Sequence, residues 1–274
     1  MQKLNSVPFP QKRGEVSFSP SSAAVLENSS FEPRFEDIET DHVEVVPESR
    51  IVFHSDPRSP GADRFRYLRM RLRELWDAGK LRSVLITSPL PQDGKSTIAL
   101  NLATVLAEHG KRTVLLIEAD LHHPTLSSQF ALPARKGLAE SLENGLNPLS
   151  FVRRLEPLGW YLLPSGHTER NPTDLLQPGA LVHVMSKLSP HFDWIIFDAP
   201  PLGPLTDAVS LSRVADASLV VARAGHTPRE GVEETFKLLG PKHVLGVVLN
   251  GMDGLDKVYS KYRAYYGKST PPTK

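Results

Sequence analysis

The amino-acid sequence predicts an α/β fold with a doubly wound, mainly parallel sheet flanked by helices. Short apolar runs rich in β-branched residues alternate along the chain with segments of helical spacing, which is typical of strands joined by right-handed helical crossovers. The runs are continuous rather than alternating, as in strands that are buried on both faces. We expect strands at 84–86, 114–117, 160–163, 194–197, 218–222 and 244–250, and helices at 61–78, 98–106, 137–142, 180–188 and 232–239.

The segment from Ser83 to Thr97 organises this prediction, because it combines a strand, a loop and the start of a helix. Gly94-Lys95-Ser96-Thr97 is the second half of a P-loop, although Pro89 stands where the first glycine of the pattern is expected. Free backbone amides at a helix start bind phosphates, the lysine contacts the β- and γ-phosphates, and the serine ligates Mg²⁺. The predicted fold is therefore of the P-loop NTPase type. The expected nucleotide-binding residues here are Pro91, Gln92, Asp93, Gly94, Lys95, Ser96 and Thr97. The alternative is an ordinary turn with a solvated lysine.

Acidic residues follow two of the predicted strands. Glu118 and Asp120 end the run at 114–117, at the edge where open parallel sheets bind ligands, and they suit one metal ligand and one proton acceptor. Asp198 ends an apolar strand as a Walker B acid does, and its carboxylate would hold Mg²⁺. We expect Asp207 to cap the next helix. The alternative for Glu118 and Asp120 is a pair of loop acids.

The bulk properties restrict the function. A net charge of +1 argues against a surface built for nucleic acid, and the absence of cysteine fits a reducing compartment. The sequence shows neither a long apolar run nor a secretory signal, so we expect a cytoplasmic protein. Residues 1–50 are rich in proline and polar residues and predict a disordered extension. Alternatively, the end of this segment, near 43–51, could form an edge strand.

The helix at 61–78 is basic and amphipathic. Asp63, Arg66 and Arg69 recur every three residues and share one face, where they could pair with acids of a neighbouring subunit. The alternative is a solvated basic face.

The end of the chain carries a cluster of tyrosines. Four of the six tyrosines are Tyr259, Tyr262, Tyr265 and Tyr266. Their density in a polar terminus favours a flexible tail at 256–274 whose hydroxyls accept phosphate. The alternatives are packing against the domain or stacking on a ligand.

Together these motifs resemble the bacterial tyrosine kinase family, the autokinases of capsule and exopolysaccharide synthesis. The resemblance covers about residues 50–267, with a kinase domain at 51–255. It is carried by the segments 87–97, 117–120, 171–176, 196–201 and 246–250, and by the tyrosine-rich tail.

The resemblance implies an ATP- and Mg²⁺-dependent protein-tyrosine autokinase. In it Lys95 would contact phosphates, and Ser96, Asp120 and Asp198 would serve the metal. Glu118 would help to deprotonate the tyrosine, and Asn250 would join the nucleotide site. The resemblance also implies a ring assembled through Asp63, Arg66 and Arg69, in which the tail of one copy is phosphorylated by another. A membrane adaptor of the polysaccharide co-polymerase type, on a separate chain, would recruit the kinase to the inner face of the membrane.

Three residues depart from the family pattern and leave other functions open. Gln92 replaces a glycine, Glu118 an aspartate and His122 an arginine. One alternative is therefore a nucleotide-binding assembly protein with weak or no catalysis. The other is a P-loop ATPase that partitions DNA or positions septa, but Leu90 stands where such proteins usually carry a second lysine.

Overall fold

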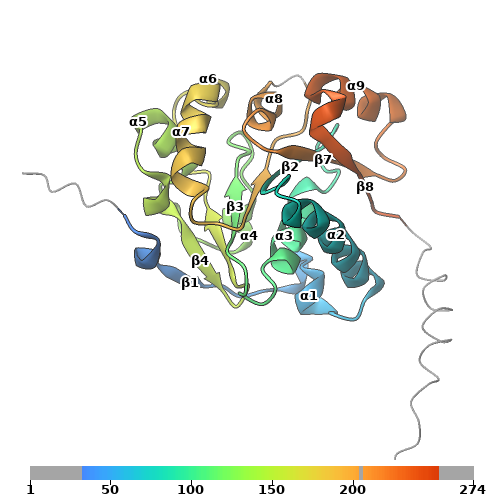
Figure 1. Cartoon of the computed structure of the whole chain (residues 1–274), viewed down its shortest axis with the longest axis horizontal. Helices are drawn as coiled ribbons and strands as arrows, with labels where there is room; N and C mark the ends of the chain where they lie inside the picture. Colours follow the sequence, from blue (N-terminus) through green and yellow to red (C-terminus); the bar gives the residue numbers. More distant parts are fainter. Residues whose placement is uncertain (1–32, 204–205, 253–274) are drawn as a thin grey trace, which may run out of the picture. The chain divides into compact units, whose positions relative to one another are not determined.

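One mixed sheet forms the centre of the fold (Figure 1). The structure is a computed structural model that describes residues 33–203 and 206–252. In this part of the chain the sheet has eight strands in the order β1-β4-β5-β3-β6-β2-β7-β8. All neighbouring pairs are parallel except β4 and β5. The predicted fold class, a mainly parallel sheet flanked by helices, is confirmed.

The described elements have the following bounds. The strands are β1 (Thr40–His42), β2 (Ser83–Thr87), β3 (Val114–Glu118), β4 (Arg153–Glu156), β5 (Trp160–Leu163), β6 (Trp194–Asp198), β7 (Ala217–Arg223) and β8 (Val244–Asn250). The helices are α1 (Val52–Ser55), α2 (Pro60–Asp77), α3 (Lys95–Leu106), α4 (Leu126–Gln129), α5 (Leu138–Asn144), α6 (Pro172–Leu175), α7 (Pro178–Leu188), α8 (Asp207–Ser212) and α9 (Arg229–Leu239). Short 3-10 helices lie at 35–37, 47–49, 148–151 and 241–243.

Two hydrophobic cores cover the two faces of the sheet. Along β2, Val84 and Ile86 belong to one core and Leu85 to the other, because successive side chains of a strand point to opposite faces. The first core includes side chains of α2, α3 and α4, and the second includes side chains of α5, α7, α8 and α9. This double cover explains why the central strands are continuous apolar runs in the sequence.

Part of the segment expected to be disordered at 1–50 is folded. Residues 40–42 form the edge strand β1 beside β4. Arg153 of β4 binds this edge with ion pairs to Glu39 and Asp41. The rest of the expected extension, and the tail from residue 253, lie outside the described residues.

Helix α2 corresponds to the basic helix predicted at 61–78. The Ser59 hydroxyl caps it by accepting a hydrogen bond from the amide of Ala62 at 3.2 Å, and Pro60 occupies its first turn. The Trp76 indole donates to the carbonyl of Asp193 at 3.0 Å and ties the helix to the sheet. None of the helices in the described ranges is long and apolar enough to cross a membrane.

Candidate active site

The P-loop connects the end of β2 to the start of α3 at the middle of the sheet. Gly94 has a φ of 99° and lies directly before the helix. This left-handed φ favours glycine, and a Cβ here would also displace the Asn250 side chain, whose Nδ2 lies 2.1 Å from that position. Gln92 also adopts a left-handed conformation, with a φ of 65°. Gln92 stands where the family pattern has glycine, and its left-handed backbone therefore adds strain to the loop.

A buried carboxylate and an amide hold the loop in this shape. Asp93 is 0% exposed, and its Oδ2 accepts a hydrogen bond from the Leu90 amide at 3.0 Å. Its Oδ1 accepts from Thr227 Oγ1 at 2.5 Å and lies 3.0 Å from His226 Nδ1. Asn250 Nδ2 donates to the Asp93 carbonyl at 2.9 Å. The ends of β7 and β8 therefore position the phosphate-binding loop.

Lys95 and Asp120 form an ion pair inside the site. The distance from Lys95 Nζ to Asp120 Oδ2 is 3.0 Å, and the side chains are 14% and 4% exposed. The other oxygen of Asp120 accepts a hydrogen bond from the His123 amide at 3.0 Å. The predicted phosphate ligand and one predicted metal ligand thus bind each other in the structure.

Asp198 lies beside this pair, at the end of β6. Its register partner on β3 is Glu118, and the side chain is 1% exposed. Burial raises the pKa of Asp198 to about 7, while the charge of Lys95 and a hydrogen bond from Ser96 act in the opposite direction. The negative charges of Asp120 and Glu118 raise the pKa further. Oδ1 of Asp198 is buried and has no hydrogen-bond partner among the described residues.

This arrangement fits a divalent cation bound together with phosphates. An unpartnered buried carboxylate oxygen is costly unless a ligand completes its bonding, and Mg²⁺ prefers one or two carboxylates plus phosphate oxygens. Ser96, Asp120 and Asp198 would hold the ion. No group of three or more histidine, cysteine or acidic side chains in the described ranges would hold a metal ion without such help.

The carboxylate of Glu118 is buried and is bound by hydrogen bonds from neighbouring segments. The side chain is 0% exposed, and Oε1 accepts hydrogen bonds from the amides of Leu126 at 2.6 Å and Ser127 at 3.2 Å. Oε2 accepts from the Ser127 hydroxyl at 2.6 Å and the Ser165 amide at 3.1 Å. Four donors thus occupy both oxygens. This geometry does not support the expected role of Glu118 as the proton acceptor for an incoming tyrosine.

Comparison with known proteins identifies the family. The chain is 33% identical over 219 residues to the tyrosine-protein kinase YwqD of Bacillus subtilis (strain 168), a match that covers 79% of this chain and 91% of YwqD. The chain belongs to the bacterial tyrosine kinase family. It is also 32% identical over 239 residues to the succinoglycan biosynthesis transport protein ExoP of Rhizobium meliloti (strain 1021), covering 81% of this chain but 30% of ExoP.

A solved structure agrees with this assignment. The kinase domain of the Escherichia coli tyrosine kinase ETK superimposes with a TM-score of 0.70 at 25% identity, covering 76% of this chain and 81% of that domain. The family described as cellulose biosynthesis protein BcsQ matches residues 92–229, from the P-loop to the start of α9.

His122, which stands where the tyrosine kinase pattern has an arginine, pairs with Asp207. His122 Nε2 lies 2.8 Å from Oδ2 of Asp207, whose side chain is 0% exposed. The expectation that Asp207 caps α8 is wrong, because the helix begins after Thr206 and its cap position has no side-chain hydrogen bond. Sequence reasoning missed this pair, since 85 residues separate its members.

The structure keeps the predicted contact residues of α2 away from the nucleotide site. Arg66 forms an ion pair with Asp63 at 2.7 Å and donates to the Pro57 carbonyl at 2.6 Å. Arg69 makes a long hydrogen bond of 3.5 Å to the Val105 carbonyl. Within one chain, Asp63 is thus paired with Arg66. The four predicted acceptor tyrosines, Tyr259, Tyr262, Tyr265 and Tyr266, lie outside the described residues.

Proposed function

We propose that the chain is an ATP-dependent protein-tyrosine autokinase. The observation that carries this proposal is the convergence of Lys95, Ser96, Asp120 and Asp198 at the ends of adjacent strands, in a chain of the bacterial tyrosine kinase family. Lys95 would bind the β- and γ-phosphates, and Gly94 and its neighbours would offer backbone amides. When bound, Mg²⁺ would neutralise phosphate charge.

In phosphoryl transfer, the main task of this chain would be to position the tyrosine and the nucleotide. The tyrosine hydroxyl attacks the γ-phosphorus and loses its proton to a phosphate oxygen of the nucleotide, while the bond to the bridging oxygen breaks and ADP leaves with that electron pair. Such a reaction depends on alignment and electrostatic stabilisation more than on a strong base. Glu118 contributes by fixing the start of α4 and the segment after β5 around the Asp120 loop. It is a positioning residue in this scheme.

The acceptors in this proposal are the four tyrosines of the tail, phosphorylated in trans within a ring of identical chains. The ring would be held through Asp63, Arg66 and Arg69, and negative charge accumulating on the tails would loosen it. A membrane adaptor on a separate chain would recruit the kinase to the cytoplasmic face of the membrane. The similarity to ExoP and to the BcsQ family supports a role in exopolysaccharide or capsule synthesis.

Incubation of the purified chain with Mg-ATP, followed by a phosphotyrosine immunoblot and mass-spectrometric mapping, tests the proposal. We expect label on the tail, its loss in Lys95→Met, and its loss when all four tail tyrosines become phenylalanine. The phenylalanine variant should retain the affinity of the wild type for ADP. Label that persists in Lys95→Met would contradict the proposal, because a contaminating kinase would then be responsible.

A nucleotide-binding assembly protein without catalysis is the second candidate. It is favoured by the buried, fully hydrogen-bonded Glu118 and by the left-handed Gln92. ADP binding without any phosphotyrosine, even with an activating adaptor present, would favour this candidate over the kinase.

A further inference from the structure

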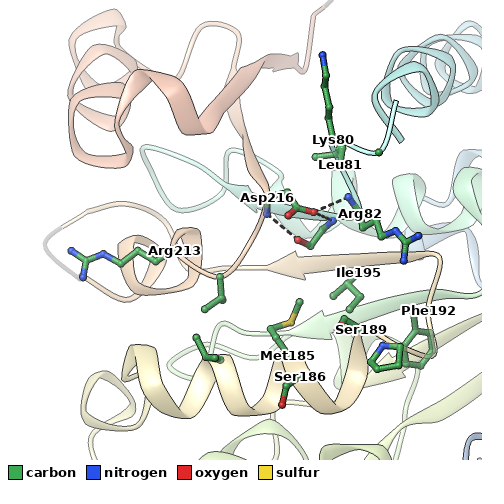
Figure 2. A pocket seen from close by; sticks show the side chains of 15 residues that line it. Lys80, Leu81, Arg82, Met185, Ser186, Ser189, Phe192, Ile195, Arg213 and Asp216 are labelled. Atoms are coloured by element: carbon green, nitrogen blue, oxygen red, sulfur yellow. Dashed lines mark hydrogen bonds between the residues drawn. The ribbon is translucent and has the colours of Figure 1, made fainter. Parts of the chain in front are cut away.

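A cleft lies at the opposite end of the central strands from the P-loop. It has a volume of about 730 Å³ and is formed by the α2–β2 connection, the end of α7, the start of β6 and the α8–β7 connection. Its buried lining is mainly apolar, with Leu81, Phe192 and Ile195 exposed by 5% or less, and it includes one buried polar residue, Ser83. Figure 2 shows Met185 of α7 extending into the cleft toward Asp216.

Two arginines flank the cleft. Figure 2 places Arg82 and Arg213 on either side of Asp216, whereas Lys80 extends away from α7. Neither arginine side chain forms a hydrogen bond or an ion pair with any residue in the described ranges. By contrast, Arg66, Arg71 and Arg73 of the neighbouring α2 each pair with an acid. The cleft therefore offers two cations that no residue in the described ranges neutralises.

Asp216, the single acid among the described residues that line the cleft, already binds backbone amides. Asp216 Oδ2 accepts hydrogen bonds from the amides of Arg82 at 2.7 Å and Ser83 at 2.8 Å. The Ser83 hydroxyl in turn accepts from the Asp216 amide at 2.9 Å. These three bonds fasten the α8–β7 connection to the start of β2. Asp216 thus builds one wall of the cleft, and its charge is directed at backbone donors.

We propose that this cleft docks a peptide segment of a partner chain, in which an apolar side chain is flanked by carboxylates. The apolar lining would receive the anchor, and Arg82 and Arg213 would pair with acids on either side of it. A peptide fits better than a small molecule because the rim is open, with Val182 of α7 58% exposed. A lipid surface fits less well, because membrane-binding sites usually gather about four to eight cations.

The site is separate from the proposed kinase chemistry. The cleft contacts Ser83, the first residue of β2, whereas the P-loop follows Thr87 at the other end of the same strand. A docked partner would leave the nucleotide site accessible. Binding at the cleft can therefore be measured whether or not the chain proves to be a kinase.

Selection from a phage-displayed library of random peptides, on the full-length chain, tests the proposal. We expect enriched sequences with a large apolar residue next to Asp or Glu. A synthetic peptide of that consensus should bind the wild type, and Arg82→Glu/Arg213→Glu should weaken it by about tenfold or more. Val182→Asp should also weaken binding of this peptide, because it places a negative charge on the rim of the cleft. The matched control is Arg58→Glu/Arg229→Glu, which makes the same change in charge outside the cleft and should leave binding within about twofold.

Two further measurements make the result decisive. ADP affinity and circular dichroism should match the wild type in every variant, since the replaced side chains are exposed or lie on the rim. The proposal is overturned if the selection enriches no acidic apolar consensus, or if the consensus peptide binds the double variant as tightly as the wild type. Binding to phosphatidylglycerol vesicles that the double variant loses, without peptide binding, would replace the peptide by a lipid surface.

Discussion

At the residue scale, Asp120 and the phosphates of the proposed nucleotide would compete for the Lys95 ammonium. In the structure Asp120 binds it at 3.0 Å, and both side chains are largely shielded from water. A nucleotide must take the ammonium from Asp120 and must also approach two carboxylates, those of Asp120 and Asp198. Mg²⁺ would satisfy these carboxylates, so the ion pair links nucleotide affinity to the presence of the metal.

Replacing Asp120 by asparagine should therefore strengthen nucleotide binding in the absence of metal. Asn keeps the shape and the acceptor for the His123 amide, but it neither holds Lys95 as an ion nor repels phosphates. We expect Asp120→Asn to bind ADP about tenfold more tightly in EDTA, or ~1.4 kcal/mol, and to gain less from Mg²⁺. Titration calorimetry measures both. Asp174→Asn, at an exposed position, is the control, and weaker binding of ADP in EDTA would refute the idea.

The raised pKa of Asp198 predicts how the stability of the nucleotide-free chain depends on pH. Its pKa is about 7 in the folded chain, against an ordinary 3.8. Between these values the folded chain holds a proton that the unfolded chain releases, so the free energy of unfolding falls as pH rises through this window. Asp198→Asn should remove the loss and be more stable than the wild type at about pH 8, by a few kcal/mol at most. Urea unfolding at about pH 5 and about pH 8 checks this, and equal pH dependence in the two proteins would contradict it.

The candidate site could be predicted from the sequence only in part. The P-loop residues and the acids at strand ends are visible locally, because a strand followed by a characteristic residue is a pattern within one short window. The contacts of Asp93 with His226 and Thr227, and the pairing of His122 with Asp207, join distant segments. Glu118 matched a catalytic pattern, yet its four hydrogen bonds depend on how α4 and β5 fold around it.

At the scale of elements, the phosphate-binding loop depends on the last two strands of the sheet. Thr227 follows β7 and Asn250 ends β8, and both bind Asp93. The loop itself contains the strained Gln92, so these outside contacts maintain a shape that the loop residues alone disfavour. Strand β8 is thereby part of the candidate nucleotide site, although no charged group lies on it.

Asn250→Ala should weaken nucleotide binding without unfolding the chain. It removes the 2.9 Å hydrogen bond to the Asp93 carbonyl, which is worth about 1 kcal/mol and predicts a loss of about fivefold in the affinity for Mg-ADP. Titration calorimetry and circular dichroism are the measurements. Val247→Ala changes an exposed neighbour on the same strand and should bind like the wild type. An unchanged affinity in Asn250→Ala would show that the loop does not need this contact.

The sequence predicts some strands and misses others, and their burial explains the difference. The buried strands β2, β3 and β6 produce apolar runs. The predicted strand at 244–250 has the bounds of β8, although β8 lies at the edge of the sheet and is only partly buried. Strands β1 and β4 produce no apolar run, because β1 contains only Thr40, Asp41 and His42, and in β4 Leu155 alone is fully buried. They are held by pairing with neighbouring strands and by Arg153, and these long-range interactions leave no local pattern.

At the scale of the whole molecule, the two sites that we propose lie at opposite ends of the central strands. The candidate nucleotide site lies at the carboxyl ends of β2, β3 and β6, and the cleft proposed to dock a peptide lies at the amino end of β2. Helix α2 belongs to the core on one face of the sheet, and its Tyr67 and Met70 are 62% and 48% exposed. This surface is the one on which we propose that the chains assemble.

Assembly through α2 must compete with contacts inside each chain. Arg66 already pairs with Asp63 and the Pro57 carbonyl, so a neighbouring chain gains only what exceeds these bonds. Among the described residues, the Arg69 side chain makes one long hydrogen bond, which leaves more of its donors for a partner. We therefore expect Arg69→Ala to shift the chain toward monomers in sedimentation velocity more strongly than Arg66→Ala does.

The matched control for this last prediction is Arg71→Ala. Arg71 lies on the same helix and pairs with Glu74 at 2.9 Å, so its loss makes the same change in charge without touching the proposed contact face. ADP affinity should be equal in all three variants, because none of the three arginines belongs to the candidate nucleotide site. A wild type that stays monomeric at every concentration, or an Arg69→Ala variant that assembles like Arg71→Ala, would exclude α2 as the assembly surface.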